Sequence, residues 1–151
     1  MEAEKVERLS PEEYELIGNA LYELMKRCPY IPNKTELGYQ IRAKGISLSL
    51  VTVSSVVKSR DVLDGFIAEV RFQISYKSFP STNLQRINAQ VVLDKIIKWF
   101  TELTEYPELT EKRKITSISA TSSLPFVDRA DADGNVVFAA DAVMEYKKKG
   151  E

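Results

Sequence analysis

The sequence predicts an α+β domain with a mostly antiparallel sheet and two main helices packed on one face, in the order α-β-β-α-β-β. Apolar residues recur every three or four positions in two segments, which is typical of amphipathic helices. In other segments they alternate with polar residues, which is typical of half-buried strands. At 151 residues the chain forms a single domain over 1–151, with a charged N-terminal extension over 1–9 and a charged tail over 147–151.

The first helix begins where Ser10 can act as the N-cap, followed by a proline at the first helical position. Glu13 completes a capping box of the S-x-x-E type. A single apolar stripe follows at helical spacing: Tyr14, Ile17, Leu21, Leu24 and Cys28. The proline after Cys28 ends the helix, because the residue before a proline is held out of the helical region. Residues 29–38, with two prolines, are expected to form an irregular connection.

Two strands are predicted next. The first alternates from Ile46 and continues to about Val57, and the second runs from Phe66 to Lys77 with one apolar and one polar face. The stretch between them, residues 54–65, is too long for a tight turn and carries aliphatic residues that a solvated loop does not need. It forms either a long functional loop or an extension of both strands into a long hairpin.

In either form, this stretch would reach past the edge of a small domain and expose apolar side chains and unpaired backbone groups. A partner subunit would cover such an edge by adding a strand to it. We therefore expect the contacts between subunits of an assembly to lie here, through Val56, Val57, Arg60, Val62 and Leu63.

The second helix is predicted over residues 84–105, with its apolar face packed on the sheet residues Val70, Phe72 and Ile74. That face consists of Ala89, Val92, Leu93, Ile96, Phe100 and Leu103. Strands are then predicted over residues 114–122 and 135–147, joined by a hairpin turn that contains an Asp-Gly pair at 133–134.

Composition excludes most catalytic machinery. With no histidine and only Cys28, the chain has no Ser-His-Asp or Cys-His catalysis, no internal disulfide, and no zinc or iron–sulfur site built on thiolates. The Asp131-to-Gly134 segment has the start of a calcium loop, but the expected bidentate Glu falls on Ala142, so a turn is favoured. Asp94 is expected to pair with a neighbouring lysine on the helix surface. We expect no catalytic, cofactor-binding or metal site, and no enzyme, although carboxylate or Ser-Lys chemistry stays open.

Net charge and hydropathy limit the classes of partner that the chain can have. The 21 basic and 22 acidic residues give a net charge of −1, which argues against specific electrostatic binding of nucleic acid. The acidic N-terminus is unlike a signal peptide, and no apolar run approaches the roughly 18 residues of a membrane span. The sequence therefore predicts a soluble protein made in the cytosol, with no membrane partner.

Several segments together resemble phage minor capsid proteins of the tail-terminator (tail-completion) family. They are the strand 66–77, the helix opening at Asn83-Leu84-Gln85-Arg86-Ile87-Asn88-Ala89-Gln90 and closing at Ile97-Lys98-Trp99-Phe100, the strand at Ile115-Thr116-Ser117-Ile118 before Ser123-Leu124-Pro125-Phe126, and the segment from Asp131-Ala132-Asp133-Gly134 to Glu145-Tyr146-Lys147-Lys148. The resemblance covers residues 66–147 best and matches the order of elements over the whole chain.

The resemblance implies a virion structural protein without a cofactor. It would form a ring, usually hexameric, on the head-proximal end of the tail tube of a phage or a tailocin, ending tube polymerisation and joining the tail to the head. Its partners would be other copies of itself, the tail tube protein, and the sheath and head–tail connector proteins, with assembly in the bacterial cytoplasm. DNA would pass through the ring. Two alternatives remain: a head-closure or neck adaptor of the same particle, and a small carboxylate-dependent enzyme.

Overall fold

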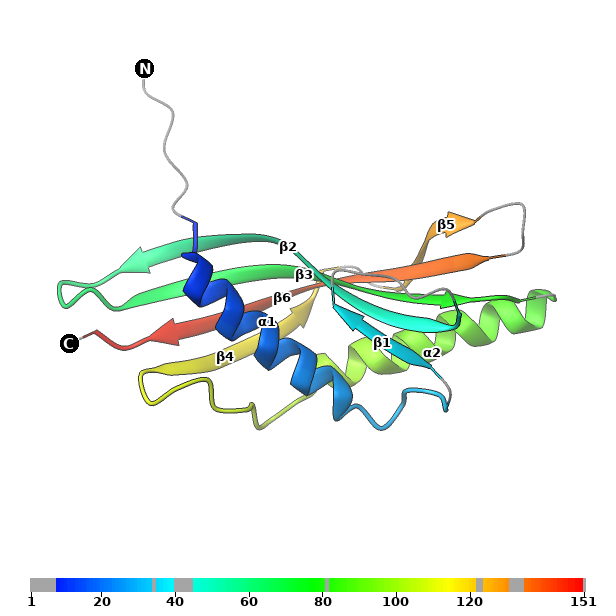
Figure 1. Cartoon of the computed structure of the whole chain (residues 1–151), viewed down its shortest axis with the longest axis horizontal. Helices are drawn as coiled ribbons and strands as arrows, with labels where there is room; N and C mark the ends of the chain where they lie inside the picture. The colour runs from blue at the N-terminus through cyan, green and yellow to red at the C-terminus, as the bar shows by residue number, and fades with distance from the viewer. Residues whose placement is uncertain are drawn as a thin grey trace, which may run out of the picture.

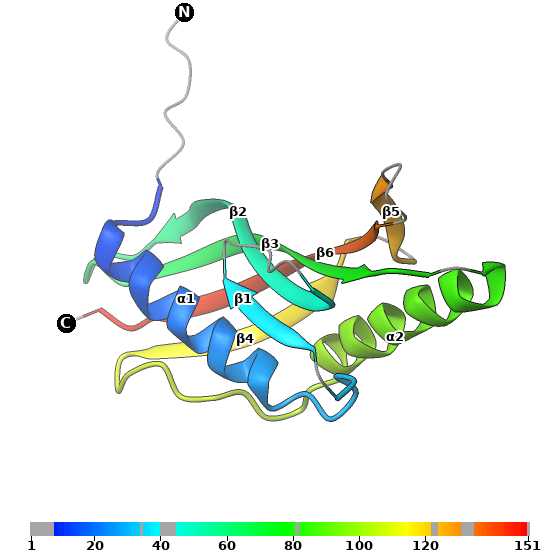
Figure 2. The ribbon, with the colours of Figure 1, turned by 45° about the vertical axis from the view of Figure 1, so that its right-hand side comes forward.

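A computed structural model describes residues 8–33, 35–39, 45–80, 82–121, 124–130 and 135–150. A twisted six-stranded sheet carries both helices on one face, as Figures 1 and 2 show. The elements are α1 (Pro11–Lys26), β1 (Glu36–Tyr39), β2 (Ser47–Arg60), β3 (Phe66–Ser78), α2 (Asn83–Thr101), β4 (Arg113–Ala120), β5 (Phe126–Ala130) and β6 (Val136–Lys148). The predicted α+β class and the mostly antiparallel sheet are confirmed.

The strands lie in the order β1-β2-β3-β6-β4, and β5 pairs with the first part of β6. Strands β4 and β5 therefore share one side of β6, and all pairs are antiparallel except β1 with β2. Two elements correct the predicted order. β1 lies partly in the connection expected to be irregular, and β5 lies where only a hairpin loop was expected.

The core lies between the sheet and the two helices. One face of β3 is buried along its length, and the partly polar opposite face carries no helix. Helix α2 packs its predicted face on this core: Leu93, Ile96 and Phe100 are buried, and the rings of Phe100 and Phe72 lie 6.1 Å apart. Val92, expected in the same face, is only half-buried.

The start of α1 confirms half of the predicted capping box. The Ser10 hydroxyl accepts a hydrogen bond from the backbone N–H of Glu13 (3.3 Å). The Glu13 carboxylate, however, binds Arg113 and Tyr146 across the sheet. Leu9, assigned to the charged extension, is buried and its backbone N–H reaches the hydroxyl of Ser55.

The stretch 54–65 takes the second of its two predicted forms, a long hairpin, since β2 reaches Arg60 before the chain turns. Two further boundaries differ from the prediction. Strand β6 continues through Lys148, so part of the expected tail belongs to the sheet. The second helix ends at Thr101, four residues early. The Asp-Gly turn at 133–134 lies outside the described residues. None of the described helices is long and apolar enough to span a membrane.

Candidate functional site

The hairpin arm, defined here as residues 54–65, ends in a well-defined turn. The Asp61 carboxylate accepts hydrogen bonds from the backbone N–H groups of Leu63 (2.9 Å) and Gly65 (2.8 Å). The backbone N–H of Asp61 donates to the Gly65 carbonyl at 2.9 Å. An Asp side chain can accept hydrogen bonds from backbone N–H groups that follow it in the chain. Such bonds stabilise a turn. The tip of the arm is therefore fixed by its own sequence.

Two further contacts hold the turn, one within the arm and one from the C-terminal segment. Asp64 adopts a φ of 68°, which is uncommon for a residue other than glycine, and its carboxylate accepts a hydrogen bond from the Arg60 guanidinium (3.0 Å). The C-terminal segment crosses close behind the turn, so that a Cβ on Gly65 would lie 2.7 Å from the backbone nitrogen of Gly150. Both glycines permit this close approach. The arm is therefore tied to the end of the chain.

The structure separates the five residues predicted to make subunit contacts. Val62 is fully exposed and Leu63 is 59% exposed, so both project from the tip. Arg60 is exposed beside them, with its guanidinium 5.3 Å from the centre of the Phe66 ring. Val56 and Val57 are half-buried and point to opposite faces of the sheet, and Val57 packs against the core. The tip residues, rather than all five, form one exposed surface.

The outer edge of β2 is open along the arm. Strand β1 pairs only with residues 47–50 of β2, and no other described strand lies beside β2 on that side. Two register shifts interrupt the pairing with β3, one near Val53 and one near Lys58. Val53 is 65% exposed. An open strand edge offers unpaired N–H and C=O groups to a strand of another chain.

A buried ionic cluster lies on the helix-covered face at the same end of the sheet. Arg113, at the start of β4, donates to both carboxylate oxygens of Glu13 in α1 (2.9 and 3.0 Å). The hydroxyl of Tyr146 in β6 donates to the same carboxylate at 2.9 Å. Burial, together with this carboxylate, raises the pKa of Tyr146 above its ordinary value. The sequence prediction missed this cluster because its members are more than 30 positions apart.

The geometry of this cluster suits holding α1 in place on the sheet rather than catalysing a reaction. The Glu13 carboxylate is shared between a guanidinium and a phenol, and its residue is only 6% exposed. A catalytic carboxylate must instead reach a substrate. The three side chains tie the start of α1 to two strands, and so hold the helix across the base of the arm.

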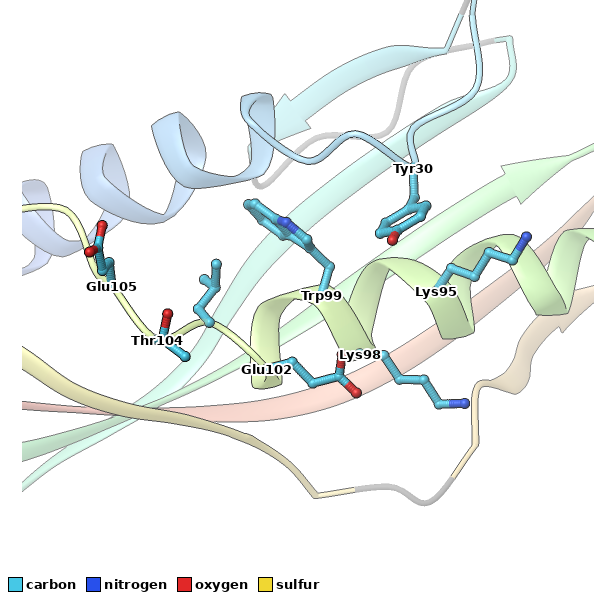
Figure 3. Close-up of a pocket in the computed structure, with 8 residues that line it drawn as sticks. Tyr30, Lys95, Lys98, Trp99, Glu102, Thr104 and Glu105 are labelled. Atoms are coloured by element: carbon cyan, nitrogen blue, oxygen red, sulfur yellow. The ribbon is translucent and has the colours of Figure 1, made fainter.

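A second surface feature is a hollow between α2 and the segment after α1, shown in Figure 3. It has a volume of about 620 Å³ and is bordered by Tyr30, Trp99 and Leu103, with charged side chains at its rim. Lys98 in this rim pairs with Asp94 at 3.1 Å, which confirms the predicted surface salt bridge. Within the described residues, no group of three or more acidic or cysteine side chains is placed to hold a metal ion.

The outer face of α2 carries an apolar stripe that the sequence pattern alone did not single out. Leu84, Ile87 and Val91 are 67%, 55% and 43% exposed, and their spacing places them on one face of the helix. On the same end of the molecule, β5 is exposed along its whole length. The helical spacing of this stripe is present in the sequence, but only the packing of the other face shows that it is left uncovered.

Comparison with known proteins identifies the fold. No protein-family model and no curated protein sequence matches the chain. Among solved structures, a chain in the virion of a native gene transfer agent particle is similar, with a TM-score of 0.53 and 10% sequence identity. The similarity covers 91% of this chain and 86% of the other, so it extends over the whole fold.

Proposed function

We propose that this protein is a structural subunit of a phage tail or a phage-tail-like particle. It forms a ring, hexameric as in the family it resembles, on the head-proximal end of the tail tube. There it stops tube polymerisation and provides the surface that joins the tail to the head. Its partners are other copies of itself, the tail tube protein, and the sheath and head–tail connector proteins of the particle, which is assembled in the bacterial cytoplasm.

Two independent likenesses support a role in a phage-like particle. The sequence resembles tail terminators over residues 66–147, through turn and packing motifs. The fold resembles a chain from a gene transfer agent virion over 91% of the present chain. The first likeness rests on local sequence and the second on the arrangement of all elements, and both lead to virion structural proteins.

The observation that carries the proposal is the hairpin arm. Its turn is held by Asp61 and by the close approach of Gly150, yet it presents Val62 and Leu63 to solvent. Placing exposed aliphatic side chains on a fixed backbone is unfavourable for an isolated subunit, but it lowers the entropy lost on binding. The open edge of β2 lies along the same arm and accepts a strand from a neighbour.

These features fit a ring of identical subunits. The arm projects from one end of the sheet, whereas the exposed stripe of α2 and the strand β5 lie at the other end (Figure 1). Contacts between two different surfaces of identical subunits form closed rings when the rotation between neighbours closes. In this proposal Arg60, Val62 and Leu63 touch the neighbour directly. Val56 lines the helix-free side of the contact, and Val57 supports the arm from the core.

The proposal is tested by the mass and shape of the purified protein, measured by light scattering and negative-stain microscopy. The wild-type protein is expected to form rings, and the double variant Val62→Ser, Leu63→Ser is expected to remain a folded monomer. Tyr30→Ser removes a half-exposed side chain from the hollow beside Trp99, outside both proposed contact surfaces, and serves as the control, which should still form rings. Rings that persist in the arm variant would overturn the arm contact, and a wild-type monomer at all concentrations would overturn the ring.

A head-closure or neck adaptor is distinguished by its partner. Such a protein would bind the head connector and leave tube assembly unchanged, whereas the proposed terminator binds the tube end. Adding tube protein and connector protein separately to the purified rings, and measuring co-sedimentation with each, decides between the two.

A further inference from the structure

The hollow at the C-terminal end of α2 lies between the two ends of the molecule that the ring contacts would cover (Figures 1 and 3). Its volume is about 620 Å³, and it is lined by residues from the last turns of α2, the segment after α2 and the segment after α1. Four of the lining residues are charged: Lys95, Lys98, Glu102 and Glu105. The lining includes no residue of the hairpin arm, of the α2 stripe or of β5. The hollow is therefore left open to a partner other than the neighbouring subunit.

Two aromatic side chains, Trp99 and Tyr30, form walls of the hollow, as Figure 3 shows. The Trp99 ring packs edge-on against the buried Phe100, with the ring centres 5.2 Å apart, so the core holds it in position. Trp99 is half-buried and Tyr30 is 50% exposed. Neither the indole N–H nor the Tyr30 hydroxyl forms a hydrogen bond to another residue that the structure describes. Tryptophan and tyrosine that offer both an apolar ring and a polar group are typical of binding hot spots.

The charges around the hollow favour a positively charged ligand. Lys98 pairs with Asp94 at 3.1 Å, and the Lys95 side chain extends away from the aromatic walls in Figure 3. Glu102 and Glu105 are exposed, and neither forms an ion pair with another residue in the described part of the chain. The hollow also lies at the C-terminal end of α2, where the helix dipole favours a cation. Two independent features therefore favour the same sign of charge.

Aromatic walls with carboxylates at the rim suit a guanidinium group best. A guanidinium stacks on aromatic rings, pairs with carboxylates and keeps its charge when it is partly desolvated. In an extended segment, the backbone carbonyls beside the arginine can also accept hydrogen bonds from the indole N–H and the phenol. An apolar side chain would leave the two glutamates without a partner, and an acidic side chain would be repelled by them.

We propose that this hollow binds an arginine side chain in an extended segment of a different protein. The guanidinium lies against Trp99, with its charge shared between Glu102 and Glu105. A different protein is the partner because the arginine of this chain's own arm, Arg60, is already paired with Asp64. The proposal goes beyond the role as a ring subunit and does not depend on ring formation, since a single subunit carries the complete hollow.

The test uses the fluorescence of Trp99, the single tryptophan of the chain. The probes are blocked tripeptides with arginine, leucine or glutamate between two glycines. The arginine tripeptide should change the emission in a saturable way, with an affinity in the millimolar range because a single side chain is anchored. The leucine tripeptide should bind more weakly, and the glutamate tripeptide should not bind. No saturable change with the arginine tripeptide, or an equal response to the leucine tripeptide, would overturn the proposal.

Charge variants locate the binding site. Glu102→Gln with Glu105→Gln should weaken binding of the arginine tripeptide by about threefold to tenfold, since two exposed ion pairs are lost. Glu108→Gln with Glu111→Gln is the matched control, because it removes the same charge from the same segment but outside the hollow. This control should leave the affinity nearly unchanged. Equal effects of the two double variants would show a response to net charge alone and would overturn the site.

Two further comparisons separate a peptide partner from free arginine, and the hollow from the ring. Free arginine, which lacks the flanking peptide groups, should bind more weakly than the tripeptide, and equal affinity would overturn a peptide partner. The arm variant Val62→Ser, Leu63→Ser should bind the tripeptide as the wild type does, although it forms no rings. Tyr30→Ser should form rings but bind the tripeptide more weakly. Failure of the hollow and failure of the ring are therefore distinguishable, and unchanged binding in Tyr30→Ser would overturn the aromatic walls as the site.

Discussion

The hydroxyl of Tyr146, close to the end of the chain, donates a hydrogen bond of 2.9 Å to the carboxylate of Glu13, 133 residues earlier. The same carboxylate receives the guanidinium of Arg113. This contact fixes α1 over the base of the hairpin arm, where three strands that are distant in sequence meet. The shared carboxylate therefore supports the arm together with the contacts of Leu9 and Tyr14 to the hydroxyl of Ser55.

Removing the guanidinium should be strongly destabilising. Arg113→Met leaves the Glu13 carboxylate buried with only Tyr146 as its partner, and breaking a buried pair in this way costs about 3–5 kcal/mol. We expect the lower end, about 3 kcal/mol, because the Arg113 side chain keeps 17% exposure. The free energy of unfolding from urea titration measures this loss. A decrease below about 1 kcal/mol would show that the pair contributes little.

The raised pKa of Tyr146 predicts a loss of stability at alkaline pH. Burial and the Glu13 carboxylate keep the phenol protonated in the folded state above its ordinary pKa of 10.0, whereas the unfolded chain ionises near that value. The unfolded state therefore binds fewer protons above about pH 10, and the free energy of unfolding falls as the pH rises further.

Replacing the phenol tests this assignment. Tyr146→Phe should lower stability near neutral pH, because the hydrogen bond to Glu13 is lost, and should show a shallower decline between about pH 10 and 11. Burial also raises the pKa of Tyr76, so part of the alkaline decline should remain in the variant. An identical decline in variant and wild type would rule out Tyr146 as a source.

The packing of α2 on the sheet gives a core prediction. Phe100 is fully buried against Phe72, so Phe100→Ala should cost about 3–5 kcal/mol. Val92→Ala, on the half-buried margin of the same helix, is the control and should cost much less. Denaturant melts of the two variants measure the difference, and similar losses would mean that Phe100 is not a central contact.

The C-terminal segment lies so close to Gly65 that any side chain at this position should destabilise the fold. In Gly65→Ala the new Cβ would meet the Gly150 backbone nitrogen at 2.7 Å and the Lys148 carbonyl oxygen at 2.9 Å. Crowding of this kind costs about 1–3 kcal/mol, and the arm must shift away from the C-terminal segment. Gly45→Ala is the control, since a Cβ there meets nothing within 4 Å. Thermal melts that show equal effects would contradict the tight crossing.

Much of the fold could be predicted because its strongest signals are local. The cap at Ser10 and the alternation in β3 depend on neighbours in sequence, and both appear as expected. Strand β1 is four residues long and β5 is exposed throughout, so neither shows the alternation that marks a half-buried strand.

The candidate sites were harder to predict, because they depend on register and long-range packing. The arm was identified by its aliphatic residues, but only the turn geometry shows that Val62 and Leu63 project while Val57 faces the core. The role of Glu13 follows from partners 100 and 133 residues away.

The central claim, that this protein ends tube polymerisation as a ring assembled through its hairpin arm, is tested most directly by tube length. Polymerising tail tube protein with saturating wild-type protein should give short tubes with a ring at one end in electron micrographs. The Val62→Ser, Leu63→Ser variant should give tubes as long as those of tube protein alone. Tubes of unchanged length with the wild-type protein would contradict the claim.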